Sequence, residues 1–387
     1  MSSWTYTDQK KDLEFCFENG DFAPSTKYKT QSPFNATKSY PSKSTWDLWF
    51  VTLSNYSFTF TGQDVILVKY NIEAVLMLIE DFGIAPASIT LLSDNDNKTA
   101  LAHAWGLETV ITDCKEIPEM KFTHVIKNPP WDKGIYAEFW PLASKALVDD
   151  GYQVDILPTN WMTLPGPRMT SARKHLLENF QILSVRIYDN SKRQVFDANT
   201  GGGDVVVMVS RKCKNPNNTM VEYTYFNNPT FTVDLTKYDF IPLYKSGLSV
   251  SILNKVLSAK LGDLECDYQS ADKVVSTHLT PFYVTGNNLA HSRENLNTNS
   301  WTVSQPSTNT DAWFLYYDSP TSAQLHYEWY KSDLFAYIIS VLKSQAKTQV
   351  KQLAITGKHN FTNNDFVSHF GFTKQHLDEV AQWKLNS

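Results

Sequence analysis

The middle of the chain alternates between short apolar runs and longer stretches in which apolar residues recur at helical spacing. Short runs rich in β-branched residues are typical of buried strands. The predicted strands span residues 65–68, 89–92, 109–112, 122–126, 152–157, 182–188 and 204–209. The predicted helices span residues 72–82, 98–105, 139–148 and 171–180, and Asp149-Asp150-Gly151 is the expected stop of the third. Strands that alternate with helices at this spacing predict βαβ units, a parallel sheet and an α/β fold class.

The pattern differs at both ends of the chain. Residues 1–46 are polar and interrupted by proline, which predicts an N-terminal arm. Beyond Asn215–Asn218, short strands (221–225 and 231–235) mix with helices (249–257 and 332–345) and with a polar loop over 286–310. We therefore predict an arm over 1–46, an α/β domain over 47–214 and a mixed α+β domain over 215–387.

Composition narrows the class of protein. A chain of 387 residues exceeds the usual size of one domain, which supports two. Its formal net charge of −5 argues against a purely electrostatic nucleic-acid binder, but not against an enzyme with a local basic cleft. Four widely spaced cysteines indicate neither a zinc site nor a disulfide framework, so we expect no metal and a cytoplasmic setting. No apolar run approaches the roughly 18 residues of a membrane span, so no membrane partner is expected.

The segment 121–131 carries the most informative pattern. An apolar strand, Phe122–Ile126, leads into Asn128-Pro129-Pro130-Trp131, where the two prolines stiffen the backbone and stop the strand. Open α/β sheets place ligands at the carboxyl ends of their strands. The Asn128 side-chain oxygen and a proline carbonyl can both accept hydrogen bonds from an –NH2 group, and Trp131 offers a face for stacking. The alternative is a rigid loop with Trp131 as a core residue.

The tetrapeptide resembles the signature of amino-methyltransferases, the S-adenosylmethionine (SAM) enzymes that methylate an exocyclic amine. The following helix, the Leu157-Pro158 strand end and the basic start of a helix at Arg173-Lys174-His175 are similar to the adenine-specific DNA methyltransferases of bacterial or phage restriction-modification systems. The resemblance covers about residues 60–212. It implies a Rossmann-like SAM-dependent methyltransferase domain, a C-terminal DNA-recognition domain, SAM as cofactor and double-stranded DNA as partner.

The resemblance also implies roles for single residues. Asn128 and the Pro129 carbonyl would accept from the adenine amine, and Pro130 and Trp131 complete the catalytic motif, with Trp131 stacking on a base flipped out of the duplex. Asp94, with Asp96 as second choice, would hold the ribose hydroxyls of SAM, and Asp113 would lie near its adenine. Each aspartate alone is also an ordinary turn residue.

The loop after the first predicted strand departs from the family. The family places glycines there, whereas this chain has Lys69, Tyr70 and Asn71. Their side chains either fill the space that the amino acid of SAM needs, or Lys69 pairs with the cofactor carboxylate. The departure keeps open a second hypothesis, a catalytically inactive relative that binds DNA or a partner protein, alone or as a homo-oligomer. A third is methylation of a protein glutamine or an RNA base.

The C-terminal region supplies the predicted DNA contacts. Lys343, Lys347 and Lys351 recur every four residues and would line one face of a helix, where they can neutralise phosphates. The alternative is a solvated helix face. The aromatic residues crowded between 313 and 330 are expected in the core rather than as a platform for bases.

Overall fold

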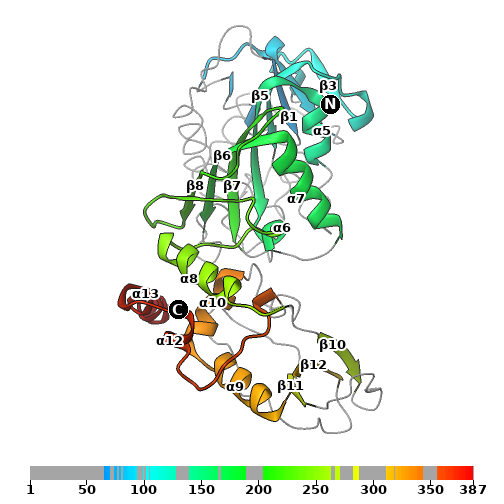
Figure 1. The fold of residues 1–387 in the computed structure, drawn as a ribbon. Helices are drawn as coiled ribbons and strands as arrows, with labels where there is room; N and C mark the ends of the chain where they lie inside the picture. Colours follow the sequence, from blue (N-terminus) through cyan, green and yellow to red (C-terminus); the bar gives the residue numbers. More distant parts are fainter. Residues whose placement is uncertain are drawn as a thin grey trace, which may run out of the picture. The chain divides into compact units, whose positions relative to one another are not determined.

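The computed structural model describes most of residues 65–127, residues 139–163, 167–188 and 204–262, and parts of the chain beyond them (Figure 1). The later described ranges are 266–270, 282–286, 311–317, 319–342 and 355–386. Within the first range, residues 70–73, 76–77, 80–81, 94–98, 100–101 and 104 are not described. The chain divides into two compact units. Unit 1 comprises Met1–Trp161 and Gly166–Asp239, and unit 2 comprises Met162–Pro165 and Phe240–Ser387.

The described strands of unit 1 form one nine-stranded sheet in the order β3-β2-β1-β4-β5-β7-β6-β8-β9. Their bounds are β1 Ile66–Lys69, β2 Ile89–Leu92, β3 Thr109–Ile111, β4 Phe122–Lys127, β5 Leu147–Pro158, β6 Phe180–Tyr188, β7 Val205–Lys212, β8 Val221–Tyr225 and β9 Phe231–Val233. Strands β1 to β5 pair in parallel, whereas β7 runs antiparallel to both of its neighbours, β5 and β6. β8 continues the sheet parallel to β6, and β9 closes the edge antiparallel to β8.

This order defines the fold. Strands β3-β2-β1-β4-β5 have the doubly wound Rossmann arrangement, in which the direction of winding reverses between β1 and β4. The seven strands expected over 65–209 are all present, and the predicted Rossmann-like α/β class is confirmed. The predicted boundary at 214/215 falls between β7 and β8 of this sheet, while the compact units divide between Asp239 and Phe240.

Helices in unit 1 cover the sheet, which is why its central strands are buried on both faces. β1 and β2 are buried along their whole length. On one face, Ile66, Val68, Ile126, Val154 and Ile156 join a single apolar cluster. On the other face lie α5 Phe139–Ala146 and α7 Pro167–Asn179, which pack against each other (Figure 1). Two short 3-10 helices, η1 Pro86–Ser88 and η2 Cys114–Glu116, lie in the connections.

One predicted boundary is wrong. The helix expected over 139–148 ends at Ala146, and Asp149-Asp150-Gly151 lies inside strand β5. The register between β4 and β5 shifts there, so the three residues form a bulge in which Asp150 has a φ of 61°. A Cβ on Gly151 would lie 3.0 Å from the Thr123 carbonyl oxygen of β4, so glycine permits this close approach. Turn residues here bend a strand instead of stopping a helix.

The buried Arg173 side chain donates hydrogen bonds to the backbone at both points where the chain leaves unit 1. Its Nη1 donates to the Trp161 carbonyl at 2.6 Å and its Nε donates to the Asp239 carbonyl at 2.9 Å. Trp161 and Asp239 are the last residues of the two segments that make up unit 1. The short helix α6 Asn160–Thr163, which the sequence pattern did not indicate, contains the first of them. Helix α7 also begins earlier than predicted, at Pro167, because proline is compatible with the first turn of a helix.

Unit 2 mixes helices with a small antiparallel sheet, as the predicted α+β class requires. Strand β12 Asp311–Tyr317 lies between β10 Cys266–Ser270 and β11 Phe282–Gly286. The helices are α8 Gly247–Ser258, α9 Pro320–Tyr330, α10 Asp333–Leu342, α12 Phe366–Phe370 and α13 Lys374–Asn386. α8 begins with a reciprocal capping box between Ser246 and Ser249. Among the crowded aromatic residues, Tyr317, Trp329 and Tyr330 are buried, which confirms the core role predicted for them.

Among the described residues, no helix has both the length and the apolar character needed to cross a membrane. Nor does the described part of the chain group three or more histidine, cysteine, aspartate or glutamate side chains in a way that could hold a metal ion.

Candidate active site at the switch point of the sheet

The register of the sheet aligns the carboxyl ends of its parallel strands. Lys69, the last residue of β1, is paired with Leu92 of β2 and with Lys127 of β4. On the outer sides, Leu92 pairs with Ile111 of β3, and Lys127 pairs with Asp155 of β5. One row of residues therefore crosses the sheet, and its centre is the point between β1 and β4 where the winding reverses. Ligands of open α/β sheets bind in the crevice at this point.

The residues predicted to bind cofactor and substrate follow this row directly in the sequence. Tyr70 is one residue beyond Lys69, and Asn128 is one residue beyond Lys127. Asp94 and Asp113 are each two residues beyond the row, after Leu92 and Ile111. The three strands whose ends precede Asp94, Asp113 and Asn128 thus end at one edge of one sheet, together with the first strand.

Several of the predicted site residues lie outside the described residues. These are Asn128, Pro129, Pro130 and Trp131, the cofactor candidates Asp94, Tyr70 and Asn71, and the lysines Lys343, Lys347 and Lys351. Their assignments stay predictions. Lys69 and Asp113 are described, and they differ sharply in their surroundings.

Asp113 is exposed and forms a turn. Its Oδ1 accepts the Lys115 backbone N–H at 2.9 Å, and its carbonyl accepts the Glu116 N–H at 3.0 Å. These contacts match the alternative interpretation of Asp113 as an ordinary turn residue. They leave its second carboxylate oxygen available to a ligand. A role near the adenine of SAM stays a prediction.

A buried polar network lies at the centre of the row. The Lys127 Nζ is 3.1 Å from the Asp155 Oδ1, and both side chains have no exposed surface. The same ammonium donates to the Gln153 Oε1 at 2.8 Å, and the Gln153 Nε2 donates to the Ser210 Oγ of β7 at 2.9 Å. Gln153 and Asp155 are two residues apart on β5, so both point to the same face. The network joins β4, β5 and β7 on the face that α5 and α7 cover.

Burial dominates the electrostatics of this network. It lowers the pKa of the Lys127 ammonium and raises that of the Asp155 carboxyl, because an apolar interior penalises both charged forms. Each group opposes the shift of the other. The Trp140 side chain and the Lys69 charge also lower the pKa of Asp155, by less than its burial raises it. Lys69, which is fully buried, therefore lies close enough to the carboxylate to interact with it.

No role was predicted from the sequence for Lys127, Gln153, Asp155 or Ser210. A signal was present, because each is a polar residue inside an apolar strand, as in Val154-Asp155-Ile156. A charge at such a position has to be paired or neutralised on folding. Its partner could not be found without the register, which places residue 127 opposite residue 155.

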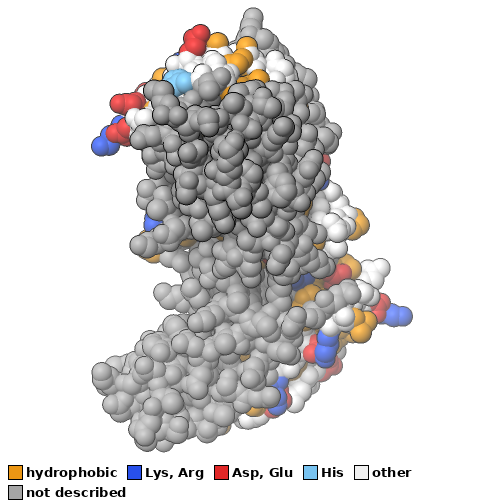
Figure 2. All heavy atoms as spheres, turned by 180° about the vertical axis from the view of Figure 1, so that it is seen from behind, with side chains coloured by type: hydrophobic (Ala, Val, Ile, Leu, Met, Phe, Trp, Pro, Cys, Tyr) orange, Lys and Arg blue, Asp and Glu red, His pale blue; other side chains and the backbone are white. Residues whose placement is uncertain are grey.

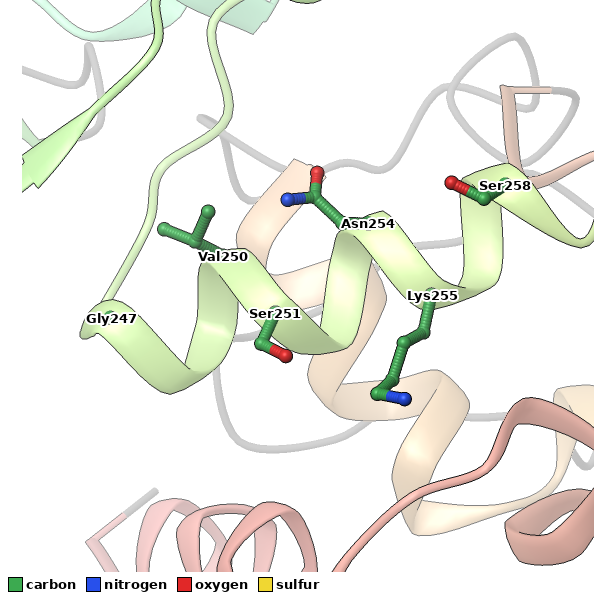
Figure 3. Close-up of a pocket in the computed structure, with 6 residues that line it drawn as sticks. All are labelled: Gly247, Val250, Ser251, Asn254, Lys255 and Ser258. Carbon is green, nitrogen blue, oxygen red and sulfur yellow. The ribbon is translucent and has the colours of Figure 1, made fainter. Parts of the chain in front are cut away.

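A second candidate is a shallow depression on unit 2. It has a volume of about 430 Å³ and is lined by six residues of α8 (Figure 3): Gly247, Val250, Ser251, Asn254, Lys255 and Ser258. Ser251 is within 3.0 Å of the His376 Nε2, and Figure 3 shows Ser251 and Lys255 on one side of the helix and Asn254 on the other. Since residues of one helix supply the whole lining, the depression lacks the convergent polar groups of a binding site.

The part of unit 2 that Figure 2 draws in colour carries charges of both signs. Along the described edge at the lower right of Figure 2, Lys and Arg side chains alternate with Asp and Glu. On α13 the same mixture appears as Lys374, Asp378, Glu379 and Lys384. The predicted lysine face at 343–351 therefore remains the candidate for phosphate contacts in this unit.

Comparisons with known proteins find distant structural similarity. No protein-family model matches the chain, and no curated protein matches it. One similar solved structure is a modification subunit of a putative type I restriction enzyme from Vibrio vulnificus YJ016, with 14% identity and a TM-score of 0.35, covering 47% of this chain and 46% of that chain. Another is the type IIG restriction endonuclease BpuSI, with 12% identity and a TM-score of 0.43, covering 87% of this chain and 60% of that chain.

A third similar structure is a putative class I S-adenosylmethionine-dependent methyltransferase from Listeria monocytogenes. Its identity is 11% and its TM-score 0.37, over 53% of this chain and 69% of that chain. The chain spans less than two thirds of both restriction-enzyme structures. Similarity of this degree assigns neither an activity nor a substrate.

Proposed function

We propose that this chain is a SAM-dependent methyltransferase that methylates the exocyclic amine of adenine in DNA. The observation that carries the proposal is the register of the sheet. It brings the ends of β1, β2, β3 and β4 into one row at the switch point, and the sequence Asn128-Pro129-Pro130-Trp131 continues directly from the end of β4. A strand end at this position is where an α/β sheet presents groups to a ligand.

The described residues fit a cofactor that carries both a nucleoside and an amino-acid carboxylate. Asp113 is exposed at the end of β3, where one carboxylate oxygen can accept from the nucleoside. In the row itself Lys69 adjoins Lys127, whose ammonium is already paired with Asp155, so Lys69 is the cation proposed for the cofactor carboxylate. Asp94 completes the proposed cofactor set, with Tyr70 and Asn71 beside Lys69 in place of a glycine loop.

The proposed chemistry uses few protein groups. SAM would supply a methyl group that its sulfonium activates and would leave as S-adenosylhomocysteine, and the methylated amine would then release one proton to water. The Asn128 side-chain oxygen and the Pro129 carbonyl accept the two amine hydrogens, which directs the nitrogen lone pair towards the methyl group. These hydrogen bonds raise the rate insofar as they strengthen in the transition state. Alignment of the two reacting atoms supplies most of the remaining acceleration.

A DNA substrate requires two further functions of the chain, base flipping and phosphate binding. A base inside a duplex has to be flipped out before its amine can reach Asn128, and Trp131 would stack on the extruded base. Phosphates flanking it need cations, for which Lys343, Lys347 and Lys351 of unit 2 are proposed. Together these residues support DNA over a protein glutamine or an RNA base as the substrate.

One observation favours a second candidate function, a relative that binds DNA or a partner protein without catalysis. Lys69 is fully buried at the end of β1, the position after which the resembling family has glycine. A bulky side chain there competes with the amino acid of SAM for space. The intact sequence of residues 128–131 supports the enzyme instead.

Calorimetric titration with SAM, followed by methyl transfer from labelled SAM to adenine-containing duplex DNA, tests the two functions. We expect binding that Asp94→Ala or Asp113→Ala weakens, and transfer that Asn128→Ala abolishes without loss of folding. Asp234→Ala is the matched control, because Asp234 forms the same kind of turn by accepting the Thr236 N–H at 2.8 Å. DNA binding without any SAM binding would support the second candidate and contradict the first.

A further inference from the structure

The chain passes between the two units three times, and two of these passages lie among the described residues. The first passage is between Trp161 and Met162, and the second is between Asp239 and Phe240. On the side of unit 1, the Arg173 Nη1 donates to the Trp161 carbonyl at 2.6 Å and its Nε donates to the Asp239 carbonyl at 2.9 Å. One side chain therefore holds the last residue of unit 1 at both passages.

Backbone hydrogen bonds hold the same two passages on the side of unit 2. The Ile241 N–H donates to the Met162 carbonyl at 2.8 Å, so the two passages are joined directly after they enter this unit. The Leu243 N–H then donates to the Val341 carbonyl of α10 at 2.7 Å. The bond between Ile241 and Met162, the two bonds of Arg173 and the backbone between them form one closed ring. Each bond of the ring lies within a single unit.

The chemistry of arginine suits this ring. Its planar guanidinium presents several donors in a fixed fork, so that two of its nitrogens can hold two carbonyls at once. A further donor, the Nη2 of Arg173, bonds the Thr170 Oγ1 one turn earlier on α7 at 3.1 Å, which orients the group. The two carbonyls belong to residues 12 and 66 positions away in the sequence, so only the fold brings them together.

Burial makes the two contacts of Arg173 depend on each other. The arginine is 3% exposed, and Trp161 is fully buried. A buried cation is stable only while its donors have acceptors. If either passage opens, the guanidinium loses a carbonyl in a place where water does not replace it, and such a loss costs more than a hydrogen bond broken at the surface. Opening one passage therefore removes support from the other.

We propose that Arg173 is a clasp that makes the two passages open and close together. The clasp couples the order of unit 1 at Trp161 to the order of unit 2 at Ile241. It does so through the closed ring and needs no other contact. This coupling is independent of the proposed function, because it involves neither cofactor nor DNA.

Hydrogen exchange of the full chain at increasing urea concentration tests the clasp. Two peptides are followed, residues 159–163 for the first passage and residues 239–243 for the second. In the wild type, their slowest amides should lose protection with the same dependence on urea, as one cooperative unit does. In Arg173→Met, the second peptide should exchange about 10-fold to 100-fold faster, the effect of one lost hydrogen bond to a charged group, and the two urea dependences should separate.

Two further variants make the result specific. Lys174→Met removes a cation from the next position of α7, where the side chain is 71% exposed, and should leave both peptides as in the wild type. Arg173→Lys keeps the charge but has only one nitrogen, so it should also separate the two peptides, and it serves as the milder change if Arg173→Met does not fold. Exchange in Arg173→Lys equal to that of the wild type would overturn the proposal. Different urea dependences of the two peptides in the wild type would overturn it as well.

Discussion

The two units both bury ionisable side chains, but they surround them differently. Unit 1 buries Lys127 beside Asp155, a cation and an anion 3.1 Å apart. Unit 2 buries His326 and His359 among aromatic rings, with the His326 ring 4.9 Å from Phe361 and the His359 ring 5.0 Å from Phe370. Lys127 and Asp155 of unit 1 each have a partner of opposite charge, whereas burial favours the uncharged form of His326 and His359 in unit 2.

Hydrogen bonds fix the neutral state of one of these histidines. The His326 Nδ1 is 2.8 Å from the Ser322 carbonyl oxygen, which can only accept, so this nitrogen carries the proton. The His326 Nε2 accepts the backbone N–H of His359 at 3.0 Å, and its lone pair is therefore used. Burial lowers the pKa of both imidazoles to about 4. We infer that a charged side chain buried at a strand end indicates a functional site, whereas a buried neutral ring contributes to packing.

The largest effect is expected from breaking the pair in unit 1. Lys127→Met alone leaves Asp155 buried without its cation, and removal of one partner of a buried pair costs about 3–5 kcal/mol of unfolding free energy. Lys145→Met, on the exposed ion pair with Glu119, should cost less than about 1 kcal/mol. Urea unfolding of both variants measures the difference. Equal losses would show that the interior of unit 1 tolerates an unpaired carboxylate.

The second effect is the acid sensitivity of unit 2. A histidine with a pKa of about 4 in the folded state and about 6.5 when unfolded binds a proton first in the unfolded chain. Stability is therefore full above pH 6.5 and falls as the pH drops towards 4, by about 3 kcal/mol for each histidine. Urea unfolding between pH 7 and pH 4, followed by hydrogen exchange of α9 and α10, should show this loss.

The variant His359→Phe sharpens that result. It should remove about half of the pH dependence, because phenylalanine fits the aromatic surroundings and does not titrate. The exposed His103 of unit 1 gives the control His103→Phe, which should leave the acid sensitivity of unit 2 as it is. A wild-type unit 2 that unfolds at the same urea concentration at pH 7 and pH 4.5 would contradict the assignment of buried neutral histidines.

The smallest effect is expected for an exposed pair of unit 2. Lys384 lies 2.7 Å from Asp333, but both side chains are more than half exposed. Lys384→Ala should lower the unfolding free energy by about 0.2–1 kcal/mol, and the loss should shrink further at high salt. Urea titrations at low and high salt check both statements. A loss as large as that of Lys127→Met would mean that distance, rather than burial, governs the ion pairs of this protein.

The apolar strands could be predicted from the sequence because their pattern is local. Four of the five residues of Val205–Val209 are β-branched valines, a composition typical of a strand, and all five are fully or almost fully buried. The bulge at Asp149–Gly151 could not be predicted, because the same residues also end helices and only pairing with β4 decides between the two. The position of β7 between β5 and β6 could not be predicted either, because it depends on pairing between strands that are far apart in the sequence.

The candidate site also has features that could be predicted from the sequence and features that could not. The strand ends that precede Asp94, Asp113 and Asn128 follow from local patterns, and the sheet brings them to one edge. The pairing of Lys127 with Asp155 depends on two strands separated by a helix, so no window of sequence contains both partners. Lys69 was predicted as a loop residue but is the last residue of β1, because its stem is buried together with the strand.

The Arg173 contacts affect how the protein can be divided. Unit 1 is discontinuous, and its last carbonyl, that of Asp239, lies 25 residues beyond the boundary that the sequence suggests at residue 214. A chain shortened after residue 214 would lose β8, β9 and this carbonyl, leaving Arg173 with an unmet donor in a buried place. A chain ending at 239 retains all of them. Any attempt to prepare unit 1 alone should therefore stop after Asp239.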